Sequence, residues 1–229
     1  NYQNTTTGSY FEKLNVAIEN SKNANIQNPN TIKVLNSIQE TTTSNILETQ
    51  KIILNLNGKT VTLNGATISN NGTLEIENSQ QTAIKNTGTL TILSGTVNNT
   101  GNGVTIANTG ITTVSGGVVN SSGTSNTIEN DGTLTISGST VSCSGSGHTI
   151  INLNNKSDLV INDGAKVTNT STSGYAISSQ VTDSTIKIDG TETLISSYYR
   201  GIYLSNNVEL RMTSGKIDVL PQNNISANP

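Results

Sequence analysis

One short stretch of the chain gathers the residue types that most often bind ligands. Arg200 stands among tyrosines in the sequence Tyr198-Tyr199-Arg200-Gly201-Ile202-Tyr203. Aromatic faces stack on sugar rings, and a guanidinium binds a carboxylate through two parallel hydrogen bonds. Tyr and Arg are also the commonest hot-spot residues of protein interfaces. We therefore predict a site for a glycan or for a host or matrix protein, with these candidate ligand-binding residues: His148, Tyr175, Tyr198, Tyr199, Arg200 and Tyr203.

The other reactive side chains are sparse. Cys143 is the only cysteine, so it permits no internal disulfide and no cysteine-based zinc site, and we interpret it as a small core residue. Four aspartates lie late in the chain, where stacked corners could bring two of them together as oxygen ligands for Ca²⁺: Asp158, Asp163, Asp183 and Asp189. Their spacing matches no calcium-binding motif, so we predict no cofactor and keep calcium as an open alternative.

The composition favours a thin, elongated β protein. Hydrophobic residues make up 31% of the 229 residues, and charged residues make up 12%, about half the share of an ordinary domain. Asn, Thr and Ser fill the gap. Such a chain cannot bury a thick spherical core, and it is too weakly charged for an ordinary disordered segment. An elongated β structure with polar ladders satisfies both constraints.

Charge and hydropathy exclude two classes of partner. The net charge is −3 and no basic stripe is present, which argues against nucleic-acid binding. No apolar run approaches the roughly 18 residues of a membrane span, so we predict no membrane insertion. The chain starts at Asn1 without a methionine or a signal peptide. We expect a monomeric module of a longer protein.

A repeat of about 22 residues organises the middle of the chain. Three independent series share this period: Ile84, Ile106, Ile128 and Ile150; Asn86, Asn108, Asn130 and Asn152; Val97, Val119 and Val141. The segment Gly88-Thr-Leu-Thr-Ile92 recurs as Gly110-Ile-Thr-Thr-Val114 and Gly132-Thr-Leu-Thr-Ile136, and we align Gly72-Thr-Leu-Glu-Ile76 with it as an earlier relative. Longer coils follow, with the same strand at Leu159-Val-Ile161, Ile186-Lys-Ile188 and Leu210-Arg-Met212.

Each repeat holds three short segments that alternate apolar and polar residues, which places Leu and Ile inside and Thr outside. No crossover helix is visible, so the pattern predicts an all-β fold, a parallel three-sheet β-solenoid. The Asn series predicts a ladder of stacked amides. His148 falls in register with Val104, Asn126 and Tyr175. A structural role in that column, with tyrosines that simply cover the last coils, is therefore the competing interpretation of the candidate site.

The two ends of the chain differ from the repeats. Ser9 and Glu12 form a capping-box pattern ahead of an apolar helical face, which predicts a helix from about Tyr10 to Lys22 that covers the N-terminal end of the solenoid. The polar tail after residue 220 predicts a linker. We divide the chain into an N-terminal segment (1–30), a parallel β-helix (31–220) and a C-terminal linker (221–229).

The stretch Leu54-Asn-Leu-Asn-Gly-Lys-Thr-Val-Thr-Leu63, followed by Gly65-Ala-Thr-Ile68 and Asn71-Gly-Thr-Leu-Glu-Ile76, resembles the opening coils of pectate-lyase-like right-handed parallel β-helix domains. In those domains a short helix caps the first coil and a Leu-Asp-Leu-Asn-Gly turn follows, in which Asn55 here replaces the Asp. The resemblance implies a right-handed β-helix over nearly the whole chain. The Gly-Thr-Leu-Thr-Ile coils look most like those of surface proteins of Gram-positive bacteria, often adhesins.

The resemblance leaves function open, because such folds include lyases, hydrolases, tailspikes and adhesins. The enzymes use clustered acids with a basic residue, whereas this chain has only Arg200 and Arg211 as arginines and no Asp-Asp pair. Gly147-His148-Thr149 is only a faint match to the Gly-His-Gly of the hydrolases. We therefore predict a non-catalytic binding module of a secreted, wall-attached adhesin. The alternatives are an enzyme acting on acidic polysaccharide and a structural stalk.

Overall fold

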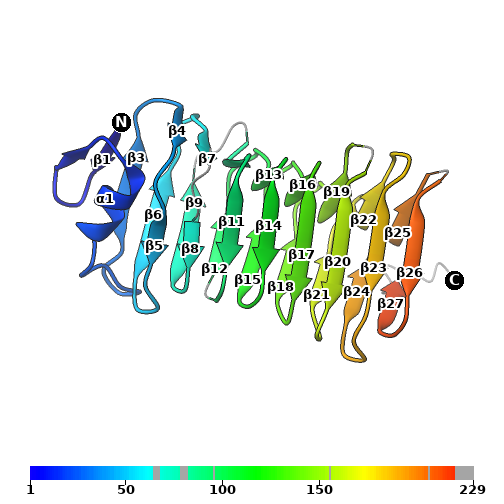
Figure 1. The fold of residues 1–229 in the computed structure, drawn as a ribbon. Helices are drawn as coiled ribbons and strands as arrows, with labels where there is room; N and C mark the ends of the chain where they lie inside the picture. The colour runs from blue at the N-terminus through cyan, green and yellow to red at the C-terminus, as the bar shows by residue number, and fades with distance from the viewer. Residues whose placement is uncertain (64–67, 78–81, 95, 155, 206, 220–229) are drawn as a thin grey trace, which may run out of the picture.

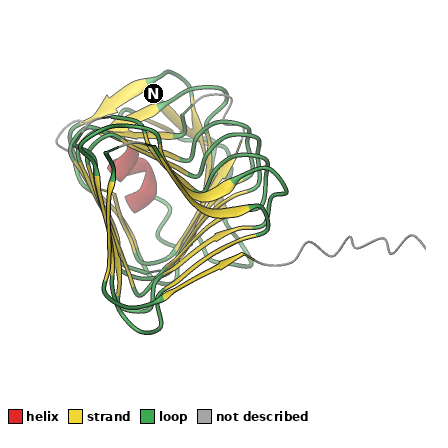
Figure 2. Ribbon diagram, turned by 90° about the vertical axis from the view of Figure 1, so that its right-hand side faces the viewer, coloured by secondary structure: helices red, strands yellow, loops and turns green. Residues whose placement is uncertain are grey.

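The chain forms a parallel β-solenoid with three sheets, seen in a computed structural model that describes residues 1–63, 68–77, 82–94, 96–154, 156–205 and 207–219. Successive coils stack along one axis from the N-terminal to the C-terminal end (Figure 1). Viewed along that axis, the coils superpose as a three-sided tube (Figure 2). Each strand pairs with the strand of the next coil, so the backbone groups of the middle coils are hydrogen-bonded on both sides.

Every coil contributes one strand to each sheet. Sheet 1 contains β1 (Tyr2–Asn4), β2 (Tyr10–Phe11), β3 (Asn30–Val34), β6 (Lys51–Asn55), β9 (Thr73–Glu77), β12 (Thr96–Asn99), β15 (Val118–Ser121), β18 (Thr140–Cys143), β21 (Lys166–Asn169), β24 (Leu194–Ser197) and β27 (Lys216–Val219). Sheet 2 contains β4 (Ile38–Glu40), β7 (Val61–Leu63), β10 (Ile84–Asn86), β13 (Ile106–Asn108), β16 (Ile128–Asn130), β19 (Ile150–Asn152), β22 (Tyr175–Ser179) and β25 (Arg200–Leu204). Sheet 3 contains β5 (Ser44–Ile46), β8 (Ile68–Asn70), β11 (Thr89–Ile92), β14 (Ile111–Val114), β17 (Thr133–Ser137), β20 (Asp158–Asn162), β23 (Thr185–Ile188) and β26 (Glu209–Met212).

The predicted period and its three series are confirmed. Ile84, Ile106 and Ile128 pair in register across β10, β13 and β16, and all three side chains are buried. The buried Asn86 and Asn108 amides each donate to the next Asn, 22 residues on, at 2.9 Å. These hydrogen bonds stabilise the fold, because a buried amide without a hydrogen-bond partner would destabilise it.

One part of the repeat alignment is wrong. Gly72-Thr-Leu-Glu-Ile76 does not belong with the Gly88 segments of sheet 3. It contains β9 of sheet 1, where Leu74 pairs with Val97. The error arises because two strands of one coil share the same Thr-Leu alternation, so only the 22-residue spacing distinguishes them.

The N-terminal cap is built differently from the prediction. The helix α1 spans only Leu14–Glu19, with Lys13 as its N-cap and no side-chain cap from Ser9. Tyr10 and Phe11 form β2 instead, because they pair with β1, which pairs in turn antiparallel with β3. The hairpin protects the edge of sheet 1, and α1 lies across the N-terminal end of the tube (Figure 2).

A distant acid replaces the predicted capping box. Oε1 of Glu40, on β4, accepts hydrogen bonds from the Leu14 N–H at 3.1 Å and from the Tyr2 hydroxyl at 2.7 Å. Glu40 is buried, and burial together with the Glu40 contact raises the pKa of Tyr2. One carboxylate thus joins β1, α1 and the first coil.

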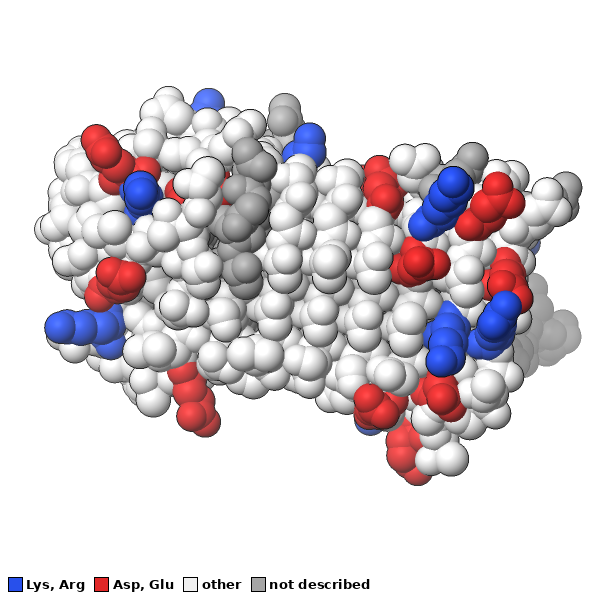
Figure 3. All heavy atoms as spheres, viewed as in Figure 1, with Lys and Arg blue, Asp and Glu red and all other residues white. Residues whose placement is uncertain are grey.

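The outer surface of the middle coils is almost uncharged. Between residues 86 and 155 the only Asp, Glu, Lys or Arg residues are Glu129 and Asp131. On sheet 3 an outward column of hydroxyls runs through Thr91, Thr113 and Thr135. The face shown in Figure 3 carries its charges at the two ends of the solenoid. In the part of the chain that the structure describes, no helix is long and apolar enough to cross a membrane. The predicted linker 221–229 lies outside the described residues.

Candidate functional site

The candidate site lies on three successive late coils. His148 precedes β19, Tyr175 opens β22, and Arg200 opens β25, where it pairs in register with Tyr175. Tyr203 follows on β25 and points outward, while its neighbours Ile202 and Leu204 pack against the core. Because β22 lies between β19 and β25 in sheet 2, Tyr175 is flanked by candidate residues from both neighbouring coils.

The aromatic rings of these coils stack along the solenoid axis. The Tyr175 ring lies 4.8 Å from the His148 ring and 5.2 Å from the Tyr203 ring, measured between ring centroids. The interplanar angles are 36° and 29°. Tyr199 approaches the Tyr175 ring at 5.7 Å with a tilt of 50°. These separations are typical of attractive aromatic pairs.

Arg200 completes this group, which we call the aromatic cluster: His148, Tyr175, Tyr199, Arg200 and Tyr203. The guanidinium carbon lies 5.0 Å from the Tyr199 ring centroid and 6.0 Å from that of Tyr175, within the range of a cation–π contact. Among the described residues no carboxylate forms an ion pair with Arg200. The side chain is exposed.

The sixth predicted residue, Tyr198, lies beside Tyr199 at the corner after β24, and its side chain is 36% exposed. Its backbone N–H donates to the carbonyl of Asn169 in the preceding coil at 3.1 Å. The ring and cation contacts given above join the other five residues.

His148 forms hydrogen bonds with the coil before it and with the coil after it. Its N–H donates to Oδ1 of Asn126 at 2.9 Å, and its Nδ1 accepts the N–H of Tyr175 at 3.0 Å. Nδ1 can accept only while it carries no proton, so the neutral imidazole here has its proton on Nε2. Burial lowers the pKa of His148 below its usual 6.5. The predicted register of His148 with Tyr175 is confirmed. His148 contacts Tyr175 both through this hydrogen bond and through its ring.

Two residues that position the cluster escaped the sequence analysis. Asn169 is fully buried, and its Nδ2 donates to the carbonyls of Gly147 at 2.9 Å and Tyr175 at 3.0 Å. Gly174 lies so close to the preceding coil that an added Cβ would meet the Gly147 oxygen at 2.1 Å. The signal available in the sequence was the pair Gly147-His148 and Gly174-Tyr175, in which each ring follows a glycine at the same corner.

The outer face beside the cluster is tightly covered. Ile151 and Ser178 occupy the outward column that leads to Tyr203, yet they are 7% and 0% exposed. Neighbouring side chains therefore pack over this part of sheet 2. The cluster is a packed, ordered surface with exposed edges at Tyr199 and Tyr203, each 38% exposed.

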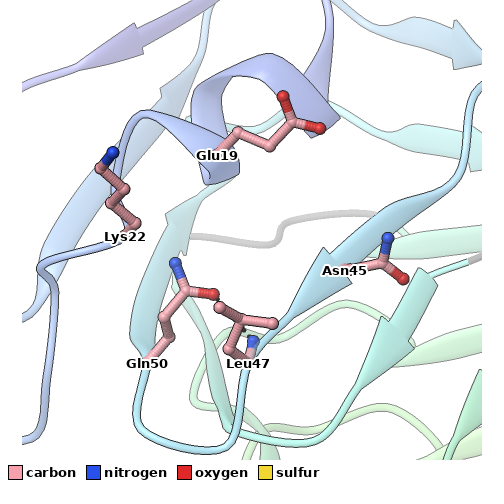
Figure 4. Close-up of a pocket in the computed structure, with 5 residues that line it drawn as sticks. All are labelled: Glu19, Lys22, Asn45, Leu47 and Gln50. Atoms are coloured by element: carbon pink, nitrogen blue, oxygen red, sulfur yellow. Dashed lines mark hydrogen bonds between the residues drawn. The ribbon is translucent and has the colours of Figure 1, made fainter.

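A hollow beside the N-terminal cap has a structural role. It is lined by Glu19, Lys22, Asn45, Leu47 and Gln50 (Figure 4). The buried Gln50 donates to the carbonyls of Ile18 and Ser21 and accepts the N–H of Leu47. Its amide thus ties the end of α1 to the first coil, and both of its polar atoms are already used.

The four late aspartates do not meet in one place. Across the described residues no three His, Cys, Asp or Glu side chains are grouped closely enough to hold a metal ion. Oδ1 of Asp189 accepts hydrogen bonds from Thr213 at 2.6 Å and Ser214 at 2.9 Å, which lower the pKa of its carboxyl. Ser137 donates to Asp163 at 2.7 Å. These two carboxylates thus link the corners of neighbouring coils through hydrogen bonds.

The single cysteine occupies the predicted place. Cys143 is buried at the end of β18. It pairs in register with Ser121 and Asn169. Its thiol lies against the carbonyl of Gly147 at 3.5 Å.

No protein-family model matches the chain, and neither a curated protein nor a solved structure matches it. One fold can serve many functions, so the aromatic cluster is the feature of this chain that bears on its function.

Proposed function

We propose that this solenoid is a non-catalytic binding module of a bacterial surface adhesin and that it holds a glycan at the aromatic cluster. The observation that carries the proposal is the packing of exposed Tyr199, Arg200 and Tyr203 against a preformed stack. Side chains that are already ordered lose little conformational entropy when a ligand binds. Two rotatable χ angles per tyrosine keep that entropy cost small.

The middle coils of the solenoid are suited to support that site. The middle coils repeat with little variation and present hydroxyls and amides with almost no charge. Such surfaces can form hydrogen bonds but offer little apolar area to hold a ligand. We propose that these coils act as a spacer and that the late coils carry the recognition.

The setting of the module is inferred from the resemblance to Gram-positive surface proteins and from the Thr-, Asn- and Ser-rich composition with one cysteine. On that basis we place the protein outside the cell, attached to the wall. An enzyme acting on acidic polysaccharide is disfavoured because two of the late aspartates, Asp163 and Asp189, accept hydrogen bonds from hydroxyls of a neighbouring coil. Among the described residues, no three His, Cys, Asp or Glu side chains are grouped closely enough to hold a metal ion.

The test is an array of glycans and matrix proteins probed with the wild-type chain and with the double variant Tyr199→Ala, Arg200→Ala. We expect binding to glycans that the double variant loses while its melting temperature stays close to that of the wild type. Binding only to matrix proteins would replace the glycan by a protein ligand. An array without any binding would favour the stalk, and release of reducing ends or unsaturated uronates would favour the enzyme.

A further inference from the structure

We propose that the aromatic cluster recognises an anionic group carried by a sugar, a carboxylate or a sulfate, and that Arg200 selects for it. The inference rests on the proposed glycan-binding function and adds the chemical class of the ligand. The inference follows from the parts of the rings and of the guanidinium that remain available to bind a ligand.

The central ring of the stack, Tyr175, has another aromatic ring on each side. Tyr175 has His148 on one side and Tyr203 on the other, because their coils lie on opposite sides of β22. Both faces of its ring are therefore covered. The edge of an aromatic ring carries partial positive charge and its face partial negative charge. The Tyr175 ring therefore leaves its edge to a ligand, and a ring edge is suited to a negative group more than to the flat apolar face of a neutral sugar.

The guanidinium adds a full positive charge at the same place. The two other cations of the last coil already have acids in their own strands: Arg211 contacts Glu209 at 2.7 Å, and Lys216 contacts Asp218 at 2.8 Å. Arg200 has aromatic rings in place of an acid. The planar guanidinium has five N–H donors in a fork that fits a carboxylate or sulfate through two parallel hydrogen bonds.

Among the described residues, the outward column of sheet 2 beside Tyr203 carries no acid in the two preceding coils. The column runs from Glu129 through Ile151 and Ser178 to Tyr203. Glu129, its nearest acid, stands three coils before Tyr203, and its Oε1 already accepts a hydrogen bond from Asn126 at 3.0 Å. The described part of the late coils thus offers, beside the Tyr199 and Tyr175 rings, a cation that forms no ion pair with an acid.

The experiment compares one glycan backbone in three forms: dextran oligosaccharides that are unmodified, carboxymethylated or sulfated. Calorimetry at physiological salt gives their affinities for the wild-type chain and for Arg200→Gln, Arg200→Lys and Arg211→Gln. We expect at least one charged form to bind about tenfold or more tightly than the neutral form. Arg200→Gln should remove that preference, and Arg200→Lys should restore it only in part, because an ammonium lacks the fork.

The matched control is Arg211→Gln, which removes an exposed positive charge from the same coil and should change affinity less than about twofold. Equal binding of neutral and charged forms would overturn the inference and leave the glycan-binding function standing. A preference for charged forms that survives Arg200→Gln would overturn it as well, since the anion would then bind elsewhere. If no form binds, the inference fails, whereas the proposed glycan function fails only if the glycan array also shows no binding. The carboxymethyl and sulfate arms identify which anion the site takes.

Discussion

The backbone N–H of Tyr175 donates to Nδ1 of His148, one coil earlier, at 3.0 Å. This bond joins the loop before β19 to the first residue of β22, where the two rings also stack at 4.8 Å. The contact depends on a lone pair that protonation removes. The order of the aromatic cluster is thereby linked to the charge state of one histidine.

The first prediction concerns pH. The pKa of His148 is lowered by burial in the folded chain, so the unfolded chain binds the proton more tightly. The contribution of this neutral histidine to stability is therefore complete above its usual pKa of 6.5 and is lost as the pH falls through the lower, folded value. Melting temperatures between about pH 7 and 5 should fall more in the wild type than in His148→Gln, which keeps an acceptor and does not titrate. Parallel curves would show that His148 makes no such contribution.

The second prediction tests the amide ladder. Asn108 donates through Nδ2 to Asn130 at 2.9 Å and to the Thr133 carbonyl at 3.0 Å, with its side chain buried. Asn108→Ala should lower the free energy of unfolding by roughly 2 kcal/mol or more, because it leaves buried partners unsatisfied. The control is Asn120→Ala on the outer face of sheet 1, where the amide is only partly buried. Urea denaturation measures both, and equal losses would contradict a structural role for the buried ladder.

The third prediction tests which side of each strand faces inward. Ile128 is fully buried between Ile106 and Ile150, whereas Thr135 points outward from β17. Ile128→Asn should cost about 2–4 kcal/mol, since it places an unsatisfied amide in the column. Thr135→Val should change the melting temperature little. Similar effects of the two substitutions would mean that the inward assignment is wrong.

The fourth prediction concerns the N-terminal cap. Glu40→Ala should destabilise the chain by roughly 2 kcal/mol or more, because the buried Tyr2 hydroxyl and the Leu14 N–H lose their shared acceptor. Glu40→Gln keeps Oε1 and should cost less. Hydrogen exchange should show faster opening of α1 and β1 in Glu40→Ala, with the late coils unchanged. Unchanged exchange at Leu14 would contradict the capping role of Glu40.

The regular coils could be predicted from the sequence because every coil repeats the same physical problem. Ile106 and Ile128 fill the same position in successive coils, and Asn108 and Asn130 face the same buried corner. Alternation gives the inward side of each strand, and a fixed period gives the register. The Thr73–Glu77 strand shows the limit, since it shares its alternation with strands of another sheet.

The N-terminal cap and the inner construction of the cluster were harder to predict, because long-range contacts decide them. Ser9 and Glu12 carry a local capping pattern, but β1 pairs with Tyr10 and Phe11, and Glu40 from β4 caps the helix. The tyrosines and Arg200 stood out by type. Their stacking depends on Asn169 and Gly174, whose roles become apparent only when the coils are superposed.

The most direct test of the account measures the affinity of the isolated chain for the glycan that binds best on the array. Calorimetry should compare the wild type with Tyr199→Ala, Arg200→Ala and with a matched double variant of the middle coils, Thr113→Ala, Thr135→Ala. We predict that the cluster variant loses about tenfold or more in affinity and that the middle-coil variant stays within about twofold of the wild type. An unchanged affinity of the cluster variant, or an equal loss in both variants, would contradict the claim that recognition lies at the aromatic cluster.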